Sequence, residues 1–157
     1  MTRTPSTSVF SHKVIQLPTV STRLMVFSSS QKWRDAVIKR LEELIRLERG
    51  WDGYDGVPVS LENVTFALRM LEAICAPDAP APQLVPGSSG DLQIEWHVVG
   101  GDIELHVQAP HKVNAWRTTI NGGGRGEEID LTNDFSTVAT WVRQLTEPDL
   151  APATAAA

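Results

Sequence analysis

The sequence predicts an α+β fold, in which two N-terminal helices and one C-terminal helix pack on one face of an antiparallel sheet of three to five strands. Apolar residues recur at intervals of three and four in two segments before residue 77, and again near the C-terminus. Between these segments the apolar pattern becomes an alternation, which is the period of a half-buried strand. Helices and strands therefore segregate along the chain, as is typical of the α+β class.

The length of 157 residues suits about one domain. We expect a flexible or partly ordered leader over residues 1–29, a single α+β domain over 30–147 and a disordered tail over 148–157. The only cysteine, Cys75, excludes an internal disulfide and agrees with a reducing compartment. Because no run approaches the roughly 18 apolar residues of a spanning helix, we expect a cytoplasmic protein without membrane contact.

The first helix is predicted from Gln31 to Arg49, with the hydroxyls of residues 28–30 as candidate N-caps and Gly50 as its stop. A short strand over Val20–Phe27 is a candidate element before it. The apolar stripe of this helix comprises Trp33, Val37, Ile38, Leu41, Leu44, Ile45 and Leu47.

The second helix begins around Pro58 and Ser60 and ends before Pro77. Cys75 lies on its apolar stripe, so we interpret it as a buried core thiol rather than a nucleophile. The remaining stripe residues are Val64, Ala67, Leu68, Leu71 and Ile74.

Strands and a third helix fill the rest of the chain. The third helix spans Asp134–Leu145, with Thr132 or Asn133 as its cap. The predicted strands are Gln83–Val85, Leu92–Val99, Ile103–Gln108, Lys112–Ile120 and Glu128–Leu131.

The second and third of these strands form a hairpin around Gly100–Gly101. With both glycines as a two-residue loop, His97 lies opposite Glu104, and Glu95 lies opposite His106. Side chains alternate across a strand, so all four would project from one face, while the apolar residues project from the other.

This polar face allows two interpretations. Imidazole and carboxylate both bind metal ions, so Glu95, His97, Glu104 and His106 are candidate catalytic residues of a metal-assisted hydrolase or nuclease, with His97 and His106 as metal ligands. A solvent-facing side with cross-strand His–Glu pairs is the alternative that we favour. We therefore expect no catalytic residue, no bound metal and no cofactor.

The loop Gly50-Trp51-Asp52-Gly53-Tyr54, followed by Pro58 and a second helix, is the most distinctive stretch. Together with the strands containing Ile94-Glu95-Trp96 and Ile103-Glu104-Leu105, it resembles a group of small bacterial and phage proteins that have a Gly-Trp-Asp-x-Tyr loop between two helices. The resemblance covers about residues 35–108. It implies a bacterial or phage origin and toxin–antitoxin or phage-defence gene neighbourhoods, but no chemistry, because no activity is established for that group.

Two roles are open for this loop. In the one that we favour, Trp51 and Tyr54 pin the helix pair to the sheet and Asp52 caps backbone amides. In the other, Trp51, Asp52, Tyr54 and Asp55 form a recognition surface.

Charge is distributed unevenly. Residues 1–49 carry a net charge of +5 and residues 50–157 carry −10. The acidic body would repel nucleic acid, except through the basic N-terminal third, and suits either a basic protein partner or solubility alone. We expect a non-enzymatic protein-binding module, such as an inhibitor, an antitoxin or an anti-phage-defence (anti-CRISPR-type) protein. The metal-assisted hydrolase or nuclease is the alternative, and a homo-oligomer is compatible with the sequence.

Overall fold

The computed structural model describes residues 13–16, 23–26, 31–120, 123 and 125–146. Three helices and a five-stranded antiparallel sheet confirm the α+β prediction. The helices are α1 (Lys32–Ile45), α2 (Leu61–Ile74) and α3 (Ser136–Thr146). The sheet has the order β3 (Gln83–Pro86), β4 (Leu92–Val98), β5 (Gly101–Ala109), β6 (Lys112–Thr119) and β7 (Glu127–Leu131).

A separate two-stranded ladder pairs β1 (Lys13–Gln16) with β2 (Arg23–Val26). The strand predicted over Val20–Phe27 is confirmed across the span of β2. The rest of the predicted leader, including the candidate caps at residues 28–30, and the predicted tail over 148–157 lie outside the described residues.

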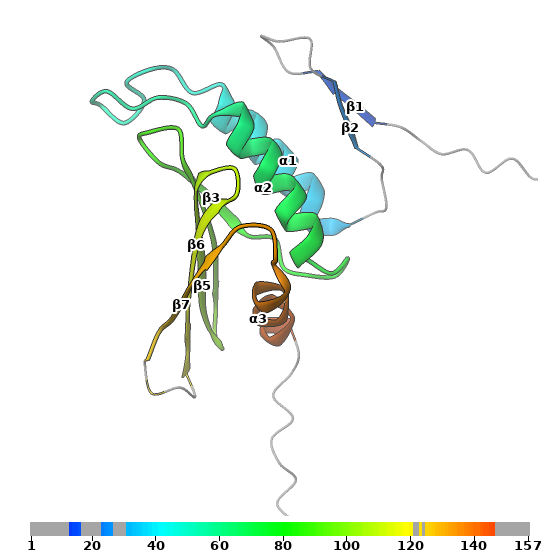
Figure 1. Cartoon of the computed structure of the whole chain (residues 1–157). Helices are drawn as coiled ribbons and strands as arrows, with labels where there is room; N and C mark the ends of the chain where they lie inside the picture. The colour runs from blue at the N-terminus through cyan, green and yellow to red at the C-terminus, as the bar shows by residue number, and fades with distance from the viewer. Residues whose placement is uncertain (1–12, 17–22, 27–30, 121–122, 124, 147–157) are drawn as a thin grey trace, which may run out of the picture.

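The five-stranded sheet is a meander, in which each strand pairs with the next one along the chain. The three helices lie on one side of it, and no described helix covers the other side (Figure 1). This arrangement follows from the alternation in the strands, because the residues of β4 and β5 that face the helices are apolar and buried. The residues between them point away from the helices.

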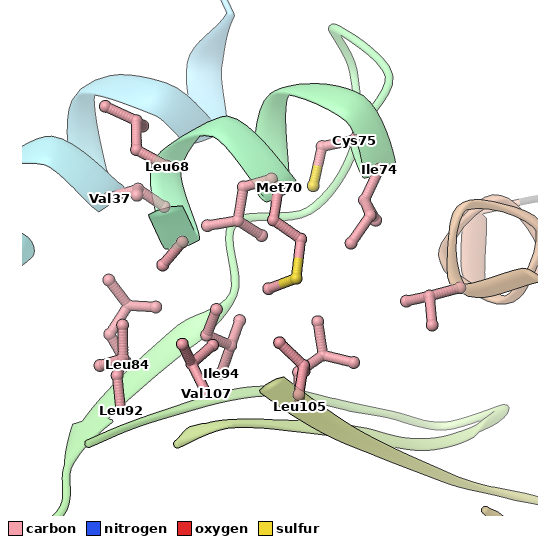
Figure 2. Close-up of a cluster of buried hydrophobic side chains, with 14 of the residues drawn as sticks. Val37, Leu68, Met70, Ile74, Cys75, Leu84, Leu92, Ile94, Leu105 and Val107 are labelled. Atoms are coloured by element: carbon pink, nitrogen blue, oxygen red, sulfur yellow. The ribbon is translucent and has the colours of Figure 1, made fainter. Parts of the chain in front are cut away.

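The core lies between the helices and this apolar sheet face. Figure 2 shows Val37 of α1 and Leu68 and Met70 of α2 above Ile94 and Leu105 of the sheet. The side chains at the centre of this interface are fully buried, among them Leu105, Ile94 and Met70. Two tryptophans, Trp33 and Trp96, expose only 1–2% of their surface. The hydrophobic contact between the two layers is the main force that holds the helices on the sheet.

Helix α1 ends at Ile45, four residues before the predicted end at Arg49, and begins after Gln31. The backbone amide of Val59, on the chain returning toward α2, donates to the carbonyl oxygen of Leu44 at 3.3 Å. That carbonyl is one of the helix-end acceptors that need a partner, and a tertiary contact supplies it. The expectation that Gly50 stops the helix was therefore wrong. Helix α2 begins as predicted, with the Ser60 hydroxyl accepting from the Asn63 amide.

The hairpin between β4 and β5 turns at Val99 and Gly100, so the predicted register is wrong by two residues. Val98 pairs with Gly101, which belongs to β5. Gly101 has a φ of 146°, and a Cβ there would lie 2.1 Å from the carbonyl oxygen of Thr118 on β6. Only glycine permits this close approach of two strands. Because the side-chain period of a strand is two, the shift changes the cross-strand partners but keeps every residue on its predicted face.

Candidate functional site

The loop between α1 and α2 closes on the carboxylate of Asp52. One oxygen, Oδ1, accepts hydrogen bonds from the backbone amides of Tyr54 at 2.9 Å and Gly56 at 3.0 Å. These two bonds, that from Tyr54 first, lower the pKa of Asp52 below its ordinary value. The predicted capping role of Asp52 is thus confirmed. A side chain at Gly56 would lie 2.6–2.8 Å from this carboxylate, so the closed loop requires glycine there.

Backbone contacts close the same loop at its base. The amide of Gly50 donates to the carbonyl of Gly56 at 2.7 Å, and the indole Nε1 of Trp51 donates to the carbonyl of Val57 at 3.0 Å. Gly50 has a φ of +83°, a conformation that L side chains rarely adopt. Both ends of the loop are therefore fixed to each other, and half-buried Trp51 bonds within the loop.

Tyr54 stands at the tip of this closed loop with 86% of its surface exposed. The expectation that Tyr54 pins the helix pair to the sheet is wrong, because the turn held by Asp52 directs it into solvent. Asp55, beside it, is also exposed. Of the four residues predicted for the loop's recognition surface, Trp51 and Asp52 thus hold the loop, while Tyr54 and Asp55 are presented by it.

The loop is joined to the sheet at the turn between β3 and β4. The amide of Val57 donates to the carbonyl of Ser88 at 2.9 Å, and the amide of Ser60 donates to the carbonyl of Gly90 at 3.0 Å. The buried side-chain amide of Asn63 donates to the same Gly90 carbonyl at 2.9 Å. These bonds fix the position of the loop relative to the end of the sheet.

The second candidate surface is the sheet face that the helices leave open, which we call the open face. Its strands carry five carboxylates, His97 and His106 and, at the end of β6, Lys112. The carboxylates are those of Glu95, Asp102, Glu104, Glu128 and Asp130. Trp116 is half-buried at its centre, and cross-strand pairing places it between Glu104 on β5 and Glu128 on β7.

His97 lies at one end of the open face and bridges two carboxylates. Its Nε2 is 3.0 Å from Glu95 Oε2, and its Nδ1 is 2.9 Å from Asp102 Oδ1. Both contacts, that with Glu95 first, raise the pKa of His97, because a doubly protonated ring can donate to both carboxylates. The predicted partner, Glu104, instead lies opposite Glu95.

His106 lies toward the other end of the open face and contacts Asp91 rather than Glu95. Its Nε2 is 2.6 Å from Asp91 Oδ2, and the backbone amide of Ser89 donates to the other oxygen of Asp91 at 3.2 Å. Burial raises the pKa of Asp91, but the hydrogen bonds from His106 and the backbone outweigh it, so the net pKa is lowered. The carboxylate thereby orients the imidazole and ties the β3–β4 turn to β5.

The four residues of the predicted metal or acid–base site do not converge. In the observed register His106 lies opposite Gln93, so its row is four residues away from the row of His97. At about 3.3 Å per residue this separates the two rows by roughly 13 Å, too far for two imidazoles on one face to share an ion. Among the described residues, no group of three or more histidine, cysteine, aspartate or glutamate side chains is arranged to hold a metal.

Cys75 is a buried core thiol, as predicted. Burial raises its pKa to about 12, which leaves almost no nucleophilic thiolate at neutral pH. It borders a groove of about 200 Å³ between the end of α2 and α3. The other residues that line this groove are alanines, Ile74, Val142 and Arg143, and none of them is a nucleophile.

Trp116 and Asp102 on the open face, and Asp91 beside it, were not predicted from the sequence. For Trp116 a signal was present, because the alternation of Val113 and Ala115 toward the core puts Trp116 on the opposite side. Asp91 had no such signal, since it lies in a turn outside the strand.

No protein-family model, curated protein or solved structure matches this chain. Within the part of the chain that the structure describes, no helix has both the length and the apolar character needed to cross a bilayer. The geometry of the loop and of the open face therefore provides the main basis for assigning a function.

Proposed function

We propose that this protein is a non-enzymatic, cytoplasmic protein-binding module that acts as an inhibitor, an antitoxin or an anti-phage-defence (anti-CRISPR-type) protein. The observation that carries the proposal is the presentation of Tyr54, which is 86% exposed at the tip of a loop closed by Asp52 and Trp51. Tyrosine is among the residues that most often dominate the binding energy of protein interfaces.

The closed loop lowers the entropic cost of binding. Ordering a flexible side chain or loop at an interface costs about 0.5–1.5 kcal/mol for each immobilised side chain. Here Asp52 fixes the backbone at Tyr54 and Gly56 before any partner arrives. Tyr54 is consequently suited to enter a pocket on a partner, with exposed Asp55 at the rim.

The alternative of a metal-assisted hydrolase or nuclease receives no comparable support, because the register separates His97 from His106. Nucleic-acid binding through the basic N-terminal third stays a prediction, since much of that segment lies outside the described residues.

Affinity capture from a native bacterial host tests the proposal, with the tagged protein as bait and Tyr54→Ala as the loop variant. Val99→Ala is the matched control, because Val99 is 92% exposed at the hairpin tip, in the turn between β4 and β5. We expect the wild type and the control to retain one partner in about equal amounts. Tyr54→Ala should lose it by about 30-fold, the effect of a 2 kcal/mol hot spot.

Asp52→Ala provides a second variant, because it keeps the tyrosine but removes the bonds that fix the loop. We expect its affinity for the captured and purified partner to fall between those of the wild type and Tyr54→Ala. The absence of any retained partner, or equal retention by Tyr54→Ala, would contradict the proposed function.

A further inference from the structure

We propose that the open face binds an arginine-rich segment of the protein partner, with one guanidinium group stacked on Trp116 between Glu104 and Glu128. This inference rests on the proposed function and adds the chemistry of the partner. It concerns the open face, which is a surface distinct from the Tyr54 loop.

The pairing of three strands creates this position. Glu104 of β5, Trp116 of β6 and Glu128 of β7 are direct cross-strand neighbours in one row. Adjacent strands lie about 4.8 Å apart, so a carboxylate flanks the indole on each side at close range. A planar cation above the ring would meet the π face below it and a negative charge on either side.

Trp116 and Glu128 are held in place before binding. A Cβ at Gly126 would lie 2.4 Å from the indole Nε1, so the ring rests against the backbone at the start of β7. The side-chain amide of Asn114 donates to Glu128 at 2.8 Å and to Asp130 at 3.2 Å. The aromatic surface and the carboxylate of Glu128 are thus preorganised, which favours recognition.

The same protein already binds an arginine in this manner on the side of the sheet that faces α3. There the guanidinium carbon of Arg117 lies 4.7 Å from the ring centre of Trp141. Its Nε donates to Glu127 at 2.7 Å, and its Nη1 donates to Gln144 at 2.8 Å. Trp116 offers the same combination of indole and carboxylate, and no described cation stacks on it.

The charge of the open face selects the occupant. It carries five carboxylates against Lys112 and His97, so it would repel nucleic acid and a second copy of its own acidic surface. Arginine fits better than lysine, because its guanidinium is planar, stacks on aromatic rings and donates in a fork that matches carboxylates. Within the described residues the side-chain carboxylate of Glu104 has no hydrogen-bond partner, so it is available for such a contact.

Fluorescence anisotropy with labelled nona-arginine and nona-lysine peptides tests the inference on the full-length protein. Simple charge attraction binds the two peptides alike, whereas stacking on Trp116 favours arginine. We expect the wild type to bind nona-arginine at least about fivefold more tightly, and Trp116→Leu to abolish that preference. Glu104→Gln/Glu128→Gln is a second variant that leaves the hydrophobic packing intact, in case Trp116→Leu fails to fold. It should weaken nona-arginine binding about tenfold.

The matched control is Glu62→Gln/Asp78→Asn, which removes the same charge from exposed positions at the start and beyond the end of α2. It should stay within about twofold of the wild type, because remote surface charges are screened by salt. Equal affinity for the two peptides, an unchanged preference in Trp116→Leu, or an equal loss in the control would overturn the inference.

The captured partner separates this inference from the proposed function. Retention of the partner by Trp116→Leu, together with its loss in Tyr54→Ala, would overturn the arginine-binding face and leave the protein-binding function standing. Failure to capture any partner would instead remove the proposed function, whatever the peptides do. Loss of the partner in both Trp116→Leu and Glu104→Gln/Glu128→Gln would support the inference.

Discussion

The neighbouring glycines of the β4–β5 hairpin should respond in opposite ways to the same substitution. In Gly101→Ala, the new Cβ would lie 2.1 Å from the carbonyl oxygen of Thr118, and the φ of 146° disfavours any L side chain. Holding a non-glycine residue in such a conformation costs about 1–3 kcal/mol. Separating the strand ends would also break the pairing of Gly101 with Thr119, at about 1 kcal/mol for the lost hydrogen bond. We therefore expect Gly101→Ala to lower the free energy of unfolding by about 2–4 kcal/mol.

Gly100→Ala is the control, because a Cβ at Gly100 meets nothing within 4 Å and its φ lies outside the range that disfavours side chains. It should leave stability unchanged or raise it by up to about 1 kcal/mol, since alanine restricts the unfolded chain. Urea unfolding followed by tryptophan fluorescence, with equal slopes for both variants, measures the difference. If Gly101→Ala is as stable as the wild type, or if both variants lose the same free energy, the observed register is refuted.

Three further outcomes follow from the core and the loop. Leu105→Ala should destabilise the domain by about 3–4 kcal/mol in urea unfolding, because Leu105 is fully buried between the sheet and the helices, and a loss below about 1 kcal/mol would contradict that packing. The Cys75 thiol, whose pKa burial raises to about 12, should resist a thiol-reactive dye in the native protein and react fully in urea; fast native labelling at pH 8 would refute its burial. The pKa of Asp52 is lowered below 3.8, so its bonds to Tyr54 and Gly56 contribute stability above about pH 3.8 that is lost as the pH falls through the folded pKa. The stability difference between wild type and Asp52→Ala, measured by urea unfolding from pH 7 to pH 2.5, should therefore shrink at acid pH, and a constant difference would exclude an ionised Asp52 as its cause.

The two candidate surfaces were only partly predictable from sequence. Trp51 and Tyr54 identified the loop, but the half-burial of Trp51 and the exposure of Tyr54 depend on hydrogen bonds to the carbonyl of Val57 and to Asp52. Strand alternation carried the signal for Trp116 on the open face, although it was not predicted there, whereas its two acidic neighbours depend on pairing with other strands. The type of a residue indicates that it could take part in binding, but its neighbours in space depend on how the strands pair.

By itself the sequence determined the order of the helices and strands after residue 30 and the face to which each residue of the central hairpin points. Both are local properties, because a period of 3.6 or of two residues repeats within one segment and needs no distant partner. The tertiary structure alone decided the hairpin register and the end of α1. Gly101 fits only against Thr118 on another strand, and the carbonyl of Leu44 is taken by the amide of Val59 from the returning chain. These are contacts between residues far apart in sequence, and periodicity within a segment carries no information about them.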